Sequence, residues 1–245
     1  MSADASSPDV ETASADYASR FAGASGRFLL GEQDRTVERA LGGDFGRRLL
    51  DVGGGHGQLR ALYARAGVPF VLHGSDPACF ARLGPPGPTE GRVVSDLRAL
   101  PFADGAFDTV LAVRLLCHLD DWELVLREMC RVASDRVLFD FPTVQGINGL
   151  TPLLFSFKRR VERNTRTYRN FRMNAFDEAL AGAGFEPART VKQFFLPLVL
   201  HRVLGNAAAS RAAEALPRAA GLTALAGSPV VMVGRRRRPP AGAGR

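Results

Sequence analysis

The sequence predicts a single α/β domain built on a doubly wound, mostly parallel β-sheet. Short apolar segments with strand character alternate with helical segments between residues 48 and 141, and this alternation is typical of parallel strands joined by right-handed crossovers. A glycine-rich turn at residues 53–57 joins the first such strand to the first helix. Hydrophobic residues make up 46% of the 245 residues, which is enough for one substantial core.

The first elements begin near residue 17. We expect one or two short helices between Tyr17 and Leu41, because Gly23, Gly26 and Gly31 interrupt the apolar pattern. The regular alternation follows, with strands and helices in turn. The expected strands are 48–53, 70–76, 92–95, 107–113 and 136–141, and the expected helices are 58–66, 77–83 and 121–132.

The alternation breaks after Pro142. A basic and aromatic segment at about 143–172 reads as an inserted cap, and an apolar, helix-like insertion is expected at about 197–222. The remaining elements are a helix at 173–183 and strands at 185–195 and 229–233. We therefore expect a domain at 17–234, flanked by a disordered N-terminal tail at 1–16 and a basic, disordered tail at 235–245.

The charge and the cysteines exclude several classes of protein. The formal net charge is +7, but only Lys158 and Lys192 are lysines, and arginine accompanies abundant Ala, Gly and Pro. We attribute this to composition and expect no nucleic-acid partner. Cys79, Cys117 and Cys130 form no Cys-x-x-Cys pair, which argues against a disulfide framework and a zinc site. A reducing cytoplasm is the expected location.

Two features bear on membranes. The first sixteen residues lack the basic start and apolar core of a signal peptide, and no stretch reaches the roughly 20 apolar residues that a membrane span needs. A peripheral contact with anionic lipids is conceivable through the apolar run Phe194–Leu204 and the basic residues Arg235–Arg238. The same apolar run reads equally well as a substrate lid.

The glycine-rich turn carries the first chemical signal. Asp51, Gly53, Gly55 and Gly57 form the pattern Asp-x-Gly-x-Gly-x-Gly between a strand and a helix. A dinucleotide fingerprint begun at Gly53 requires glycine at position 58, where this chain has Gln58. An ordinary tight turn between strand and helix remains an alternative.

Two more acidic residues follow at the ends of expected strands. Asp76 ends the second strand about 25 residues after Asp51, where a carboxylate can accept from both hydroxyls of a ribose. Asp96 and Leu97 follow the third strand and lead into an acidic turn before the fourth. Taken alone, Asp96 has a helix N-cap as an alternative reading.

In series, these motifs resemble class I S-adenosylmethionine-dependent methyltransferases of the small-molecule type, similar to the methyltransferase type 11 and quinone-biosynthesis branch. The resemblance covers about residues 45–141. It implies a Rossmann-like sheet of seven strands with an antiparallel last strand and helical cap insertions, and S-adenosylmethionine as the cofactor. Asp51 would hold the turn and the cofactor's amino group, the glycines would leave room for its methionine portion, Asp76 would bind ribose, and Asp96 with Leu97 would meet adenine. The cofactor has an ammonium and a sulfonium but no phosphate, so a carboxylate suits it.

The resemblance continues through the end of the fourth strand. Val113 and Arg114 would line the methionine end, and His118 would border the substrate as the first candidate base. A structural role for His118 is the alternative, and His201 in the expected lid is a second candidate base. Tyr17 matches an aromatic N-terminal helix that closes over the cofactor, although core packing explains it equally well.

These patterns predict an in-line transfer of a methyl group to a small-molecule acceptor, aromatic or apolar, without a metal. Aromatic residues interleaved with arginines in the caps fit such an acceptor, and amphipathic helices with solvated arginines fit them equally. The alternatives are a lipid or isoprenoid-quinone acceptor at the membrane surface and a non-catalytic S-adenosylmethionine-binding protein. A nicotinamide-dependent oxidoreductase is disfavoured by the glycine spacing and the lack of a clear Tyr-x-x-x-Lys pair. No oligomeric state follows from these patterns.

Overall fold

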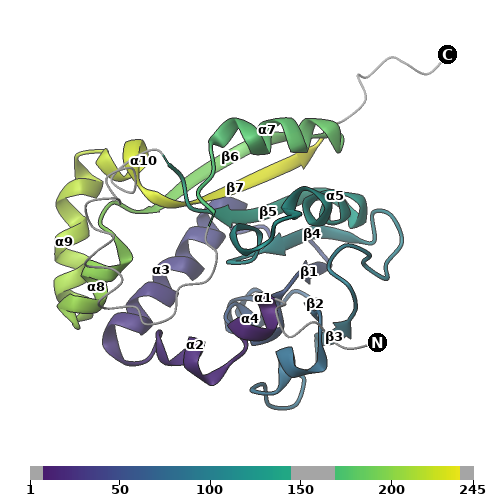
Figure 1. Cartoon of the computed structure of the whole chain (residues 1–245), viewed down its shortest axis with the longest axis horizontal. Helices are drawn as coiled ribbons and strands as arrows, with labels where there is room; N and C mark the ends of the chain where they lie inside the picture. The colour runs from purple at the N-terminus through teal and green to yellow at the C-terminus, as the bar shows by residue number, and fades with distance from the viewer. Residues whose placement is uncertain (1–7, 145–168, 238–245) are drawn as a thin grey trace.

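The predicted sheet is present in the computed structural model, which describes residues 8–144 and 169–237 (Figure 1). Its seven strands lie in the order β3-β2-β1-β4-β5-β7-β6. Neighbours from β3 to β5 pair in parallel, whereas β7 runs antiparallel to both β5 and β6, as expected for the last strand. The strands are β1 Leu49–Asp51, β2 Phe70–Gly74, β3 Glu90–Val94, β4 Phe107–Ala112, β5 Ala133–Phe141, β6 Phe185–Phe194 and β7 Ser228–Arg236.

Helices cover both faces of the sheet. On one face α5 and α7 pack on Leu50, Val110 and Val137; on the other α3 and α4 pack on Leu49 and Leu111. Successive residues of a strand point to opposite faces, and both faces are covered, so the inner strands carry apolar residues at consecutive positions, such as Leu49 and Leu50 in β1 and Val110 and Leu111 in β4. The helices are α1 Pro8–Thr12, α2 Ala15–Ser19, α3 Gly23–Leu41, α4 Arg60–Ala66, α5 Trp122–Val132, α7 Met173–Gly182, α8 Leu198–Leu204, α9 Ala207–Ala219 and α10 Leu222–Ala226; the short 3-10 turns are η1 Gly54–His56, η2 Pro77–Phe80 and η3 Leu116–His118.

The N-terminal segment differs from the prediction. Residues 8–12 form α1, so the expected disorder is wrong for residues 8–16, while residues 1–7 lie outside the described part. The physical reason is a long-range anchor, because buried Asp9 accepts hydrogen bonds from Ser75. The expectation of one or two short helices between Tyr17 and Leu41 is also wrong in part, since α3 is one long helix of 19 residues. Gly26 lies inside it, and a Cβ there would come within 1.9 Å of the Phe21 carbonyl oxygen.

The C-terminal half confirms some expectations and corrects others. The insertion predicted at 197–222 is helical, and it extends through α10 to Ala226. The predicted start of the disordered tail at residue 235 is too early, because the backbone of Arg235 pairs in β7. In addition, the Arg236 guanidinium donates to the carbonyls of Cys130 and Ala133. The cap expected at 143–172 lies mostly outside the described residues. Within the described residues, no helix has the length and apolar character of a membrane span.

Candidate functional site

The carboxyl ends of four parallel strands meet at one edge of the sheet. β1 lies between β2 and β4, so the chain order reverses direction between β1 and β4. Ligands of doubly wound sheets bind at such a switch point, outside the carboxyl ends of the strands. The structure brings the loops of Asp51, Asp76, Asp96 and Arg114 to this edge, as the sequence predicts.

Asp51 forms the floor of the glycine-rich turn. Asp51 is 2% exposed, and its Oδ2 accepts a hydrogen bond of 2.9 Å from the Tyr63 hydroxyl on α4. Burial raises the pKa of the Asp51 carboxyl to about 7, against the opposing effect of that hydrogen bond. A Cβ on Gly54 would lie 2.2 Å from Asp51 Cγ, so the turn lies directly on the carboxylate.

The turn also interlocks with the segment that follows β2. Gly53 and Gly57 both have φ of +69°, a left-handed conformation that favours glycine. A Cβ on Gly55 would lie 2.6 Å from Cys79 Cβ, and one on Gly57 would lie 2.5 Å from Leu83. The protein's own packing therefore requires small residues here, in addition to any room left for a ligand.

Asp76 and Asp96 follow β2 and β3 at the same edge. Asp76 Oδ1 accepts from the Ala78 amide at 2.8 Å, and its other oxygen makes no hydrogen bond within the described residues. Asp96 is exposed; its Oδ1 accepts from the Arg98 amide at 2.8 Å and from the Arg98 guanidinium at 3.3 Å. This is local capping, so the capping alternative for Asp96 stays open. Leu97 beside it is buried.

The loop after β4 has an unusual backbone. Arg114 has φ of +59°, and no other non-glycine residue in the described part of the chain has a positive φ. Its amide donates to Asp140 Oδ1 on β5 at 2.6 Å, which holds the loop in this conformation. Burial raises the pKa of the Asp140 carboxyl to about 6. The sequence reasoning missed Asp140, although an acidic residue inside an apolar strand was a usable signal.

The N-terminal helix α1 lies against the turns η1 and η2 that follow β1 and β2 (Figure 1). The Asp9 carboxylate on α1 accepts from the Ser75 amide at 2.7 Å and from the Ser75 hydroxyl at 2.6 Å. Ser75 directly precedes Asp76 in the chain. Tyr17 is buried and packs on Phe21 with ring centroids 5.5 Å apart, and the Arg114 guanidinium lies 4.2 Å from the Phe21 centroid. Tyr17 therefore reaches the switch point through Phe21. Sequence reasoning missed Asp9, which sits in a segment expected to be disordered.

Several buried polar atoms at this edge have no hydrogen-bond partner within the described residues. They are both ring nitrogens of His56, Oε1 of Gln58 and Nη1 of Arg114. Burial, and next the charge of Arg114, lower the pKa of His56 to about 4, so its imidazole is neutral at pH 7. Buried polar groups normally find partners, so this set marks where a polar ligand fits.

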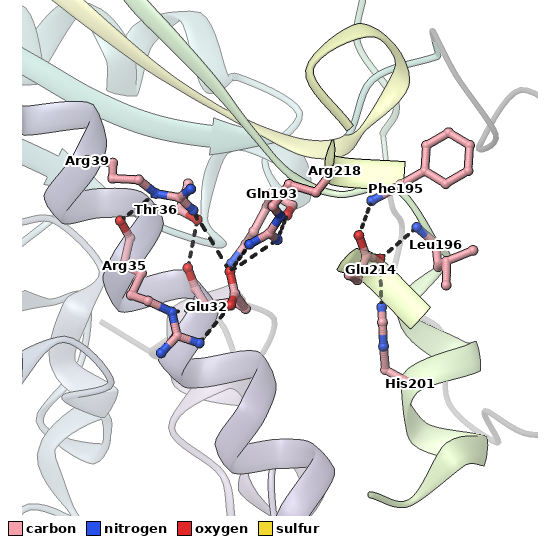
Figure 2. A network of polar contacts seen from close by, with 10 residues as sticks. All are labelled: Glu32, Arg35, Thr36, Arg39, Gln193, Phe195, Leu196, His201, Glu214 and Arg218. Carbon is pink, nitrogen blue, oxygen red and sulfur yellow. Dashed lines mark hydrogen bonds and ion pairs between the residues drawn. The ribbon is translucent and has the colours of Figure 1, made fainter. Parts of the chain in front are cut away.

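The two candidate bases lie in different places. His118 ends η3, four residues after Arg114, and is half-buried. His201 is fully buried in α8, where its Nε2 lies 3.1 Å from Glu214 Oε1 (Figure 2). Its ring packs against Phe28 and Phe194. The structure therefore groups His201 with the inserted helices, and brings only His118 to the switch-point loops.

Removal of the Tyr63 hydroxyl tests the floor of the turn. Tyr63→Phe leaves the buried Asp51 carboxylate without its donor, so we expect the free energy of unfolding at pH 8 to fall by about 1–3 kcal/mol. The loss should be smaller at pH 5, where Asp51 is protonated in the folded state. Urea unfolding followed by circular dichroism at both pH values measures it. Equal stability of the two proteins at pH 8 would contradict this account of Asp51.

Comparison with known proteins agrees with this geometry. Residues 50–139 match the sequence model of the methyltransferase domain. The chain is 42% identical over 89 residues to an uncharacterized methyltransferase of Mycobacterium sp. (strain JLS), covering 36% of this chain and 34% of that protein. It is 49% identical over 41 residues to ajmaline N-methyltransferase of Rauvolfia serpentina, covering 17% and 14%. The first of these matches spans about a third of its relative.

Solved structures extend the likeness to the whole fold. Magnesium protoporphyrin IX methyltransferase from Synechocystis PCC 6803 with bound SAH aligns with a TM-score of 0.61 at 15% identity, over 93% of this chain and 97% of that one. Geranyl diphosphate methyltransferase in complex with GPP and sinefungin aligns with a TM-score of 0.57 at 15% identity, over 84% and 77%. The chain has the Rossmann-like class I methyltransferase fold.

Proposed function

We propose that the protein is an S-adenosylmethionine-dependent methyltransferase that methylates a small-molecule acceptor of aromatic or apolar character. The observation that carries this proposal is the set of carboxylates at the ends of three adjacent strands: Asp51, Asp76 and Asp96. The methyltransferase names of the relatives, and the SAH and SAM bound in structural neighbours, support it.

The residues at the switch point fit this cofactor. S-adenosylmethionine combines an ammonium, a sulfonium and a carboxylate with an adenosine and carries no phosphate. Asp51 and the turn above it would hold the ammonium, and the unpaired Arg114 Nη1 would donate to the carboxylate. The free oxygen of Asp76 would accept from the ribose, and Asp96 with Leu97 would hold adenine. The unpaired atoms of His56 and Gln58 supply further donors and acceptors beside the turn.

A dinucleotide fits this edge less well. A pyrophosphate needs unobstructed backbone amides at a helix N-terminus. Here the turn lies on the Asp51 carboxylate, whose charge would oppose a phosphate, and position 58 carries Gln58. The same acidic floor attracts a cationic ligand.

The chain's own residues would contribute alignment and exclusion of water. When bound, the cofactor supplies an activated methyl group on sulfur. The Arg114 loop, held by Asp140, would fix the methionine end together with Val113. Helix α1, anchored through Asp9, and the Phe21 ring beside the Arg114 guanidinium would cover the loops and keep water out. His118 would take the proton from a phenol or enol acceptor.

A second candidate function is a non-methylating protein on the same fold. One structural neighbour, with a TM-score of 0.55, is a [4+2]-cyclase, so the fold alone does not fix group transfer. A lipid or isoprenoid-quinone acceptor is the main variant within methyl transfer.

A methyl-donor consumption assay separates these functions. The purified chain is incubated with S-adenosylmethionine and phenolic, quinone and lipid acceptors, and formation of S-adenosylhomocysteine is followed. We expect turnover with at least one class, and a rate at least about 100-fold lower in His118→Ala if His118 is the base. His201→Ala serves as the comparison at the second histidine. Cofactor binding without turnover in any class would favour the non-methylating alternative.

A further inference from the structure

The inserted helices α8, α9 and α10 expose an unusual number of large apolar side chains. Nine large hydrophobic side chains are exposed in the described chain, and six of them lie on this insert. Val203, Leu216 and Leu225 reach exposures of 60%, 77% and 73%. The six are Leu200, Val203, Leu204, Leu216, Leu222 and Leu225. We call them the apolar surface of the insert.

The interior of the insert is polar instead. Four polar side chains are buried there: His201, Ser210, Glu214 and Thr223. In α9 the pattern is the inverse of an ordinary surface helix, because Glu214 is 2% exposed and Leu216 is 77% exposed. Such an inverted arrangement indicates that the outer face meets an apolar environment.

The insert is held firmly in this orientation. Glu214 accepts from the amides of Phe195 and Leu196 at 3.0 and 2.9 Å, and from His201 (Figure 2). The Arg218 guanidinium reaches Glu32 on α3 at 3.3 Å and so fixes the end of α9. Glu214 and Arg218 therefore connect α9 to the segment after β6, to α8 and to α3.

The exposed charge of the insert is positive and lies on Arg211, because Arg218 is paired with Glu32. Residues 197–227 contain Arg202, Arg211 and Arg218, and their single acidic residue is the buried Glu214. Arg211 is exposed and makes no ion pair within the described residues. Apolar side chains flanked by cations are typical of surfaces that lie on anionic lipid.

We infer that the surface of α8–α10 binds to an anionic lipid bilayer. The contact keeps Leu200, Val203 and Leu204 from the apolar run that the sequence suggested and adds residues of α9 and α10, whereas Phe194 is 2% exposed and takes no part. Figure 1 shows α8, α9 and α10 together at one end of the molecule, beside α3. The contact goes beyond the proposed methyl transfer and needs no turnover, so each is tested separately.

Vesicle co-sedimentation of the full chain tests this inference. We expect binding to vesicles of phosphatidylcholine with phosphatidylglycerol, and at least about tenfold weaker binding for the double variant Leu216→Gln/Leu225→Gln. Both leucines are more than 70% exposed, so the variant should fold and keep its affinity for S-adenosylmethionine. Arg211→Gln should lower binding to the anionic vesicles about fivefold without changing the weak binding to pure phosphatidylcholine.

The matched control is Leu124→Gln on α5, because Leu124 is also exposed, at 46%, but lies outside the insert. Its vesicle binding should equal that of the unmodified chain. Absence of binding to anionic vesicles, or equal losses in the control and the double variant, would overturn the inference. A third result would also overturn it: the unmodified chain does not bind vesicles and sediments as a dimer, whereas the double variant sediments as a monomer. The surface would then join two copies of the chain.

Discussion

Replacing Asp76 with alanine is expected to lower the affinity for S-adenosylmethionine by about 100-fold or more. A carboxylate that accepts from two ribose hydroxyls forms charge-assisted hydrogen bonds, each contributing roughly 1.5–3 kcal/mol. One oxygen of Asp76 caps the Ala78 amide, while the other is free for a ligand within the described residues. Isothermal titration calorimetry measures the change directly.

Two further variants distinguish binding from folding. Asp76→Asn keeps an acceptor for the Ala78 amide but loses the charge, so it should preserve η2 and still bind weakly. Asp104→Ala removes a carboxylate with 82% side-chain exposure, outside the switch point, and should change affinity less than about twofold. Unchanged affinity in Asp76→Ala would remove Asp76 from the ribose site.

Binding of S-adenosylmethionine should strengthen about tenfold between pH 6 and pH 8. The Asp51 carboxyl has a pKa of about 7 because it is buried, so most molecules are protonated at pH 6 and ionised at pH 8. The ionised form attracts the ammonium of the cofactor, so binding would release a proton in this window. Titrations in buffers of different ionisation enthalpy measure that release.

The stability of the ligand-free protein should change in the opposite direction. A raised pKa means that the folded state holds the proton more tightly than the unfolded state. The contribution of Asp51 to the free energy of unfolding therefore falls as pH rises from about 4 to about 7. Asp51→Asn should therefore be more stable than the unmodified chain at pH 8, yet bind the cofactor more weakly and without the pH dependence. Asp104→Asn is the control, because the Asp104 side chain is 82% exposed and lies outside the switch point, so the pH dependence of binding should stay as in the unmodified chain. If cofactor binding by Asp51→Asn still strengthened between pH 6 and pH 8, Asp51 would not be the group that binds the ammonium.

The sheet could be predicted from sequence because its central strands contain short apolar runs, such as those in β1, β2 and β4, between clear turn signals. The glycine turn and the acids that follow β1, β2 and β3 could be predicted for the same reason, since parallel strands deliver their carboxyl ends to one edge. The hydrogen bond between Asp51 and Tyr63 could not be predicted, because the orientation of side chains in a buried turn depends on how α4 packs.

The remaining features depend on contacts between distant residues. Five-residue α1 has little intrinsic stability and is fixed by Asp9 and Ser75, which are 66 residues apart. His201 reads as an accessible base in sequence, and only the packing of α3, β6 and α9 around it shows its enclosure. The inverted pattern of the insert likewise becomes visible only when exposure is known.

Calorimetry of the purified chain with S-adenosylmethionine and, separately, with NADH tests the central claim most directly. The claim is that the acidic switch point selects a cationic cofactor without phosphate. We predict saturable binding of S-adenosylmethionine at one site per chain and no measurable heat with NADH. Tight binding of NADH with none of S-adenosylmethionine would contradict the proposed cofactor and the assignments of Asp51, Asp76 and Asp96 together.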